Sequence, residues 1–480
     1  MNGQLYRFRS VEALLGERNE LRAQHIYFAS PSQLNDPMEG FSDVLWQGDA
    51  IVWENLLRHY LVCLERAYSL LVIGGETQPI SWNYIPVVDP GDDRAWSPQH
   101  RAMHDSIFAR FFSEPVIGKM IAALAGRGGP VRRHELSQYL GSIHHFALLL
   151  IREEQMRRGL APVQGTDEAE REAALKQIGQ AVAVVVQLKM LKADPAASED
   201  SIDLFLSQSV LMNRQIEQIH FSNNTMDAKL FNRNFVFIHF TEGYVDQVER
   251  NLYQDWYAAC FMGSCSNSSI WGSYGENHAG ICLRFKTTLH DGKHSIALTR
   301  PYGIGTDGLI SGSLAHDFQK VEYTNKHVSI DFFECLGRLP APTLDKYWYC
   351  NAEHKRSSSA DAMHRSQQEW RDGYWKNFTA KTASKLKDWR YEDEYRLILT
   401  GELDFSTTES RKATYDFESL DGIVFGIKTP LETKLAISRI IEEKCRATGR
   451  TDFKFFQAYY ARSKGVIEHH DLSLLKFTQA

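Results

Sequence analysis

Two glutamates near the end of the chain, Glu392 and Glu394, have the spacing of a pair that could do chemistry. They lie in the stretch WRYEDEYRLIL at residues 389–399, where a charged, aromatic segment runs into an apolar one typical of a strand. On an extended backbone, residues two apart point to the same face. Two carboxylates on one face repel each other unless cations or a ligand compensate. The spacing therefore indicates either a solvated strand held by surface ion pairs or a catalytic edge.

Cations that could compensate the pair flank it on both sides. Arg396 follows the glutamates, and four basic residues precede them: Lys381, Lys385, Lys387 and Arg390. Exposed ion pairs are common and contribute little stability. The presence of these cations therefore does not distinguish a catalytic edge from a solvated strand.

Residues suited to binding an anion lie close to the N-terminus. Alternating apolar and polar residues over 6–9 predict a half-buried strand with Arg7 and Arg9 on one face. A short helix is expected over 11–21. A second strand is expected over 25–29, and it contains Tyr27.

A turn rich in proline and capping residues follows this second strand at 30–40. Asn35 and Asp36 in the turn are candidate ligand contacts. The alternative is turn chemistry alone, in which Asp36 accepts hydrogen bonds from neighbouring backbone N–H groups.

A segment of small, hydroxyl and aromatic residues lies in the middle of the chain. The sequence IWGSYGENHAG at 270–280 follows a serine-rich loop and precedes a strand expected at 281–285. Trp271 and Tyr274 could sandwich a planar base while Ser273 donates a hydrogen bond. The same residues are also typical of a core followed by a turn, and both interpretations stay open.

Hydrophobic periodicity divides the chain into a split α+β core domain and a helical insertion. Between residues 44 and 226, apolar residues recur at intervals of three and four, which predicts helices. Residues 1–43 and 227–480 form the core domain, with a mixed, mostly antiparallel β centre. Expected strands there include 235–240, 256–262, 318–323, 421–427 and 453–458, and expected helices are 329–336, a helix through 387 and 431–445.

Composition favours a globular protein of two or three structural units. The chain has 480 residues, a net charge of −6 and seven scattered cysteines. The charge argues against a protein that coats nucleic acid, and the cysteines fit reduced thiols in a cytoplasm. No apolar run reaches membrane-spanning length and no secretory signal begins the sequence, and no membrane association is expected.

No metal is predicted from the cysteine and histidine patterns. Cys260 and Cys265 lack a second pair, and the adjacent His144 and His145 point to different helix faces. The sequence GIGTDG at 303–308 matches a dinucleotide fingerprint but follows no buried strand. EHHD at 468–471 has the types of metal ligands without a spacing that brings them together.

Taken together, the motifs resemble the bacterial family described as domain of unknown function 2971. They are LYRFRS at 5–10, IYFASPSQLNDPME at 26–39, CF at 260–261, WGSYGENHAGICL at 271–283 and KDWRYEDEYR at 387–396. The resemblance covers about residues 1–43 and 251–460. The helical insertion departs from the compact pattern, and Met262 stands where the pattern has serine. Relatives of this kind often sit beside prokaryotic stress and phage-defence genes, which implies a stress or antiviral-defence effector.

The residue order also resembles the arginine–serine–glutamate class of ADP-ribosyltransferases. That class has an early arginine, a serine on a middle strand and Glu-x-Glu before a late strand. Arg7 or Arg9, Ser273 or Ser264, and the glutamate pair follow this order. The resemblance implies an ADP-ribosyltransferase-like fold that takes NAD as its substrate.

In that resemblance, Glu394 stabilises the oxocarbenium-like state formed when the nicotinamide–ribose bond of NAD breaks. Glu392 aligns or deprotonates the acceptor, which would be a protein or a nucleic acid. An arginine fork binds the pyrophosphate. The implied NAD contacts are Arg7, Arg9, Tyr27, Asn35, Asp36, Trp271, Tyr274 and Arg396.

Two other classes of function compete with the transferase. In the first, the same pocket binds a nucleotide-like small molecule without cleaving it, and the helical insertion acts on a partner protein. The second is a nuclease, for which no metal-binding carboxylate cluster has recognisable spacing.

Overall fold

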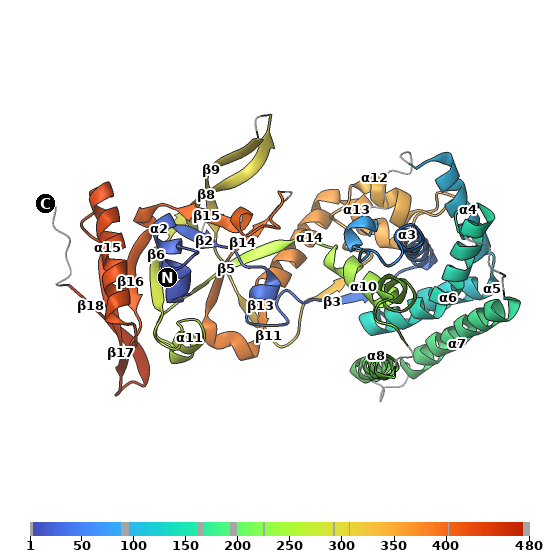
Figure 1. The fold of residues 1–480 in the computed structure, drawn as a ribbon, viewed down its shortest axis with the longest axis horizontal. Coiled ribbons are helices and arrows are strands. Elements are labelled where there is room, and N and C mark those ends of the chain that lie inside the picture. The colour runs from blue at the N-terminus through green and yellow to red at the C-terminus, as the bar shows by residue number, and fades with distance from the viewer. Residues whose placement is uncertain are drawn as a thin grey trace. The chain divides into compact units, whose positions relative to one another are not determined.

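A computed structural model describes residues 3–87, 96–161, 165, 167–192, 199–223, 226–290, 293–306, 308–401 and 403–473. The chain forms two compact units (Figure 1). We name them the sheet unit, Met1–Phe41, Gln254–Val328 and Phe378–Ala480, and the helical unit, Ser42–Tyr253 and Ser329–Asn377. The helical unit therefore includes residues 227–253 and 329–377 in addition to the segment 44–226 expected from periodicity.

The sheet unit is built on an eight-stranded sheet that is antiparallel except between β16 and β17. Its strands are, in spatial order, β10 (Gln319–Lys320), β14 (Glu394–Thr400), β5 (Trp256–Met262), β1 (Gln4–Arg9), β6 (Ile281–Lys286), β16 (Leu420–Phe425), β17 (Lys454–Ala461) and β18 (Val466–Asp471). Helix α15 (Leu431–Thr448) connects the parallel pair, as such a crossover requires (Figure 1). The predicted α+β class with a mostly antiparallel centre is confirmed.

A second sheet completes the sheet unit. It contains β2 (His25–Tyr27), β15 (Lys412–Tyr415), β8 (Lys293–Gly305) and β7 (Thr288–His290), with β9 (Gly308–Asp317) paired to β8. Residues 303–306 and 308 of the GIGTDG motif lie at the end of the long β8–β9 hairpin, which extends from the sheet in Figure 1, and residue 307 lies outside the described residues. Two short parallel strands, β11 (Glu322–Thr324) and β13 (Ser384–Leu386), lead toward the glutamate pair.

The main hydrophobic core of the sheet unit takes side chains from both sheets and from α15, including Phe28, Phe261, Leu283, Leu397 and Tyr415. A second cluster lies around Trp271 on α11 (Ser268–Ser273) and includes Phe8 of β1. The alternation of β1 therefore serves two cores, since Leu5 belongs to the first and Phe8 to the second.

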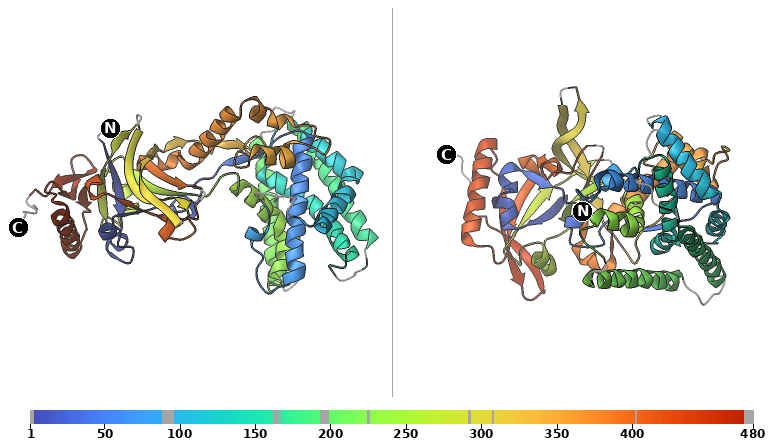
Figure 2. Two further views of the ribbon diagram at one scale, coloured as in Figure 1. Left: turned by 90° about the horizontal axis from the view of Figure 1, so that it is seen from above. Right: turned by 45° about the vertical axis from the view of Figure 1, so that its right-hand side comes forward.

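The helical unit consists mainly of long helices with a small sheet (Figure 2). The helices are α3 (Ala50–Gly74), α4 (Pro98–Phe112), α5 (Pro115–Ala125), α6 (Arg133–Arg157), α7 (Glu168–Lys192), α8 (Glu199–Ser222), α9 (Phe231–Asn234), α10 (Phe240–Arg250), α12 (Ala341–Leu344), α13 (Asp361–Arg365) and α14 (Gln367–Thr382), whose end belongs to the sheet unit. The small sheet has the order β12 (Ser329–Asp331), β3 (Asp43–Trp46), β4 (Val131–Arg132). Asp49 caps α3, because its side chain accepts hydrogen bonds from the N–H groups of Ile51 and Val52.

Short helices connect these elements. The 3₁₀-helices are Pro31–Gln33, Trp82–Tyr84, Ser358–Ala360, Lys387–Glu392, Glu409–Arg411 and Phe417–Ser419, and π-helices occupy Phe235–His239 and Asp345–Tyr349. The helix expected over 11–21 is two short helices, α1 (Val11–Leu15) and α2 (Glu20–Ala23). The helical conformation is interrupted between them, where Asn19 has a left-handed φ of 45°.

Two other expectations about local structure were wrong. The apolar run 235–240 is a π-helix leading into α10, not a strand, because its aromatic side chains pack on neighbouring helical segments, as Phe237 does on Tyr68. A short apolar run cannot distinguish a strand from a buried helix by itself. Residues 329–336 are strand β12 followed by a turn, not a helix, because the carboxylate of Asp331 accepts a hydrogen bond from the N–H of Phe333.

The helix expected to run through 387 is also shorter than predicted. It ends at Thr382, and β13 follows directly. None of the helices in the described ranges combines the length and apolar character needed to cross a bilayer.

The motif at 274–280 forms a strained turn that packs tightly on the end of β16. Glu276, Asn277 and His278 have left-handed φ angles of 50°, 51° and 71°. The carbonyl oxygen of His278 accepts a hydrogen bond from the N–H of Lys428, and Gly426 donates to Gly280. A side chain on Gly426 would meet the His278 carbonyl oxygen at 2.3 Å, and only glycine allows this approach.

Gly426→Ala is expected to lower the free energy of unfolding of the sheet unit by about 1–3 kcal/mol, because the added methyl group forces the turn away. Gly272→Ala is the matched control, since a Cβ at this position in α11 meets no atom within 4 Å. Urea denaturation with hydrogen–deuterium exchange of β16 peptides measures the effect. Equal protection in the two variants would contradict the close approach.

Candidate functional site

Lys385, on β13, is the centre of a buried cluster of charges in the sheet unit. Its Nζ lies 2.8 Å from Oε2 of Glu392 and 3.0 Å from Oε2 of Glu394. Oε2 of Glu39 is 3.6 Å away. The side chain of Lys385 is 4% exposed. One ammonium group therefore faces three carboxylates out of water.

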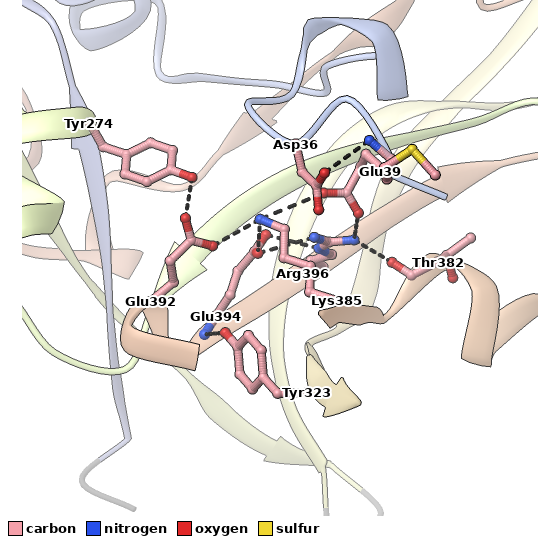
Figure 3. A network of polar contacts seen from close by, with 10 residues as sticks. Asp36, Glu39, Tyr274, Tyr323, Thr382, Lys385, Glu392, Glu394 and Arg396 are labelled. Atoms are coloured by element: carbon pink, nitrogen blue, oxygen red, sulfur yellow. Dashed lines mark hydrogen bonds and ion pairs between the residues drawn. The ribbon is translucent and has the colours of Figure 1, made fainter. Parts of the chain in front are cut away.

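Arg396 supplies the second cation of this cluster. Its guanidinium forms a two-bond fork with Glu394, at 2.8 Å from Nε to Oε1 and 3.1 Å from Nη2 to Oε2. Nη1 donates to Oε1 of Glu39 at 2.6 Å and to the carbonyl oxygen of Thr382 at 2.7 Å. Figure 3 shows the charged ends of Glu39, Lys385, Glu392, Glu394 and Arg396 pointing toward one another. We call Glu39, Lys385, Glu392, Glu394 and Arg396 the ion network.

The two glutamates converge through a sharper turn than an extended backbone provides. Glu392 ends the 3₁₀-helix Lys387–Glu392, Asp393 has a left-handed φ of 44°, and Glu394 begins β14. The expectation of an extended backbone across the pair was wrong, although both side chains do reach the same ammonium group. Register then fixes Glu394, which lies opposite Met262 of β5.

Two tyrosines hold the ends of this arrangement. The hydroxyl of Tyr274 donates to Oε1 of Glu392, so that both oxygens of this carboxylate have donors. The hydroxyl oxygen of Tyr323 accepts a hydrogen bond from the backbone N–H of Glu394 at 2.9 Å. Burial raises the pKa of both phenols, and the nearby glutamate charges add to the effect. Both side chains therefore stay neutral donors or acceptors.

The surroundings separate the pKa values of the two glutamates. Burial favours the protonated form of each. For Glu394 the charges of Arg396 and Lys385 outweigh burial and lower the pKa to about 2. For Glu392 burial prevails over the contacts with Lys385 and Tyr274, and its pKa is raised. Glu394 is thus the firmly ionised member, and Glu392 takes up a proton first.

A cleft of about 200 Å³ lies beside the ion network, within the sheet unit. Five residues predicted from the sequence line it: Arg7, Arg9, Tyr27, Asn35 and Tyr274. Lys385 lines it as well, and the remaining lining residues are uncharged. Among the described residues, three cations and no carboxylate therefore line the cleft.

The three cations differ in what already neutralises them. Lys385 contacts the three glutamates, and Arg9 forms a two-bond fork with Glu20. Arg7 is 5% exposed; its Nη2 donates to the carbonyl oxygen of Tyr27 at 2.8 Å, and its Nη1 is buried without a hydrogen-bond partner among the described residues. Burial lowers the pKa of Arg7 to about 10, which leaves it charged at neutral pH.

The other predicted site residues do not line the cleft. Asp36 is buried and accepts a hydrogen bond from the N–H of Met38 at 2.9 Å, as turn chemistry predicts. Trp271 is fully buried, donates to the carbonyl oxygen of Cys265 and packs edge-on against Phe8. Ser273 is exposed at the end of α11.

Ser264, the alternative to Ser273, is also exposed, and Arg396 belongs to the ion network, not to the cleft wall. Sequence reasoning did not assign Glu39 or Lys385 to the site. Glu39 ends the turn motif at 26–39, and Lys385 was considered only as one of several cations. The sequence Ser384–Leu386 shows no alternation that would predict its burial, since the lysine is buried and the leucine beside it is only half-buried.

Residues 270–397 match the model of a protein family of unknown function, DUF2971. The predicted resemblance to this family is confirmed over that segment, which contains Tyr274, Lys385, Glu392, Glu394 and Arg396. No curated protein and no solved structure matches the chain. The resemblance to ADP-ribosyltransferases stays a prediction.

Glu394→Gln is expected to destabilise the sheet unit by about 3–5 kcal/mol, because it leaves Arg396 and Lys385 short of a buried counter-charge. The pKa of Glu394 is about 2 in the folded chain against an ordinary 4.5. Its ionised form therefore stabilises the fold above about pH 4.5, and this contribution is lost as the pH falls toward 2. Urea denaturation at several pH values, with hydrogen exchange of β14 peptides, measures both effects.

Glu322→Gln is the matched control, because Glu322 is an exposed glutamate on β11 of the same unit. It should leave stability and its acid dependence unchanged. The buried ion network would be contradicted if Glu394→Gln were as stable as this control and kept the same loss of stability in acid.

Proposed function

We propose that the cleft of the sheet unit binds an anionic, nucleotide-like small molecule, with Arg7 as its main anion contact. The unpartnered Nη1 of Arg7 carries this proposal. A buried charged donor without an acceptor costs free energy, and a ligand oxygen at that position removes the cost. A guanidinium also offers two parallel N–H donors, which suit phosphate or carboxylate.

The rest of the cleft fits the same ligand class. None of the described residues that line it is a carboxylate that would repel an anion, and Tyr27 and Tyr274 offer aromatic surface next to the cations. The side-chain amide of Asn35, which is exposed, adds a polar contact at the cleft. The cleft, at about 200 Å³, is smaller than the roughly 300–1,000 Å³ usual for small-molecule sites. A cleft of this size suits the phosphate-bearing part of a nucleotide.

Arg7→Gln is expected to weaken binding of a phosphate-bearing ligand by roughly 10–100-fold, the loss typical of one charge-assisted hydrogen bond. Calorimetric titrations with AMP, ADP-ribose and NAD, and with uncharged adenosine for comparison, measure the affinity. Wild type should prefer the phosphate-bearing compounds. Arg462→Gln, an exposed arginine of the same unit, should bind as wild type does.

A second variant keeps this test decisive if Arg7→Gln folds poorly, which thermal melting would reveal. Asn35→Trp places a large side chain at an exposed position of the cleft and should block binding while the core stays intact. Binding by wild type that neither variant weakens would contradict the assignment of the ligand to this cleft, as would no binding of any phosphate-bearing compound.

ADP-ribosyl transfer from NAD is the second candidate. Arg7 and Glu394 support it, because their strands β1 and β14 both pair with β5, and Lys385 both lines the cleft and contacts Glu394. Arg396 and Lys385 occupy both oxygens of Glu394, so that the carboxylate would have to exchange these partners for the oxocarbenium. The binding role needs no such exchange and is therefore favoured.

If the chain cleaves NAD, Glu394→Gln should lower the rate of nicotinamide release by about 100-fold or more, since the charge that faces the oxocarbenium is lost. Rates are compared per folded molecule, with Glu322→Gln as the matched control. Glu392→Gln should reduce transfer to an acceptor more than hydrolysis. No nicotinamide release by wild type, or equal rates in wild type and Glu394→Gln, would contradict the transferase.

An interaction role for the helical unit also stays a proposal. Helix α8 supports it, because it exposes a row of large apolar side chains: Leu204, Leu211, Met212, Ile216 and Ile219. Exposed apolar patches of this kind often mark surfaces that bind other proteins.

A further inference from the structure

A cluster of metal-ligand residues lies in the helical unit, within that unit alone. His100 and His104 are four residues apart on α4, which places both imidazoles on one face of the helix. Glu65 of α3 faces them, with its Oε2 at 3.5 Å from Nε2 of His100 and 3.1 Å from Nε2 of His104. All three ligand atoms lie within 4.8 Å of one another.

We propose that Glu65, His100 and His104 bind a divalent cation of the zinc type, with one coordination position open to solvent. This site is independent of the cleft proposed above, because it uses no residue of the sheet unit. It also departs from the sequence expectation of no metal, which considered His144 and His145 but not the pair four residues apart.

The spacing of the three ligand atoms supports the proposal. Zinc lies about 2.0–2.2 Å from histidine nitrogen and carboxylate oxygen, so that two ligand atoms at the tetrahedral angle are about 3.4 Å apart. The distances from Glu65 to the two histidines bracket this value. A cation bound to Glu65 could therefore reach either histidine, and all three ligand atoms lie within 4.8 Å of one another.

The groups behind Glu65 orient its carboxylate. Its Oε1 accepts a hydrogen bond from Ser69 at 2.5 Å and one from Gln155 at 3.3 Å, while Oε2 faces both histidines. Outer partners of this kind fix ligands in metal sites. These contacts leave Oε2 of Glu65 facing the two imidazoles.

The three side chains differ in exposure, as expected for a metal that keeps one coordination position open to water. The side chains of Glu65 and His104 are 2% and 3% exposed, whereas that of His100 is 35% exposed. Solvent can therefore reach the cluster on the side of His100. Two imidazoles and one carboxylate with an open fourth position are typical of zinc, whereas magnesium and calcium prefer oxygen ligands alone.

Zinc titration of the chelator-treated full-length chain tests the proposal. Wild type should bind about one Zn²⁺ per chain at this site, and its melting temperature should rise with Zn²⁺ and not with Mg²⁺. His100→Ala should weaken binding by at least about 100-fold, because losing even an outer partner costs up to that much. Cobalt(II) in place of zinc should give the visible absorption of a four-coordinate centre in wild type only.

Two further variants separate this site from other zinc-binding groups of the chain, such as its free cysteines. His145→Ala removes a half-exposed histidine of the same unit and should bind zinc as wild type does. Glu65→Gln keeps the size of the side chain and should lose affinity as His100→Ala does. Equal affinity in His100→Ala and His145→Ala, or no stoichiometric zinc in wild type, would overturn the proposal and leave a hydrogen-bonded cluster only.

Discussion

The sheet unit depends on the neutralisation of three carboxylates by two cations away from water. Each charge in this ion network would cost several kcal/mol to bury alone, and the cost is offset only if the partners meet with good geometry. Lys385, Arg396 and Glu39 come from β13, β14 and the turn after β2, and the network therefore requires these segments to meet. With all groups ionised the network carries one excess negative charge, and the raised pKa of Glu392 identifies where a proton relieves it.

The sequence predicted those parts of the fold in which local pattern and burial agree. Strand β5 has the predicted bounds because its apolar run ends at a glycine and a serine-rich loop, and α15 begins where predicted, after Pro430. The misread segment Phe235–His239 has the composition of a strand, yet contacts from Tyr68 and Trp82, far away in the chain, hold it as a helix. Such long-range packing decides structure wherever local preference is ambiguous.

The candidate site was predictable to the extent that charge and the alternation of side chains along a strand are local properties. Arg7, Arg9, Tyr27, Asn35 and Tyr274 line one cleft, although Tyr274 lies far along the chain from the other four. What the sequence could not reveal is which charges are already paired. Glu20, on the helix that follows β1 closely in the chain, forms an ion pair with Arg9. Glu39 forms an ion pair with Arg396, which lies 357 positions away in the sequence. Of the three cations that line the cleft, Arg7 has a buried donor without a partner among the described residues, and no local pattern distinguishes it from Arg9.

The pairing of charges also decides which chemistry suits the cleft. The ion network draws Glu39, Glu392 and Glu394 away from the cleft wall, and only Lys385 belongs to both the wall and the network. A cleft lined by cations and not by carboxylates attracts an anion. A buried carboxylate that is already paired with two cations is poorly placed to stabilise a new positive charge. An anionic ligand that drew Lys385 toward itself would weaken its hold on Glu394. If the cleft binds such a ligand, Lys385 would link ligand binding to the exposure of Glu394, because its ammonium group both faces the cleft and contacts that carboxylate.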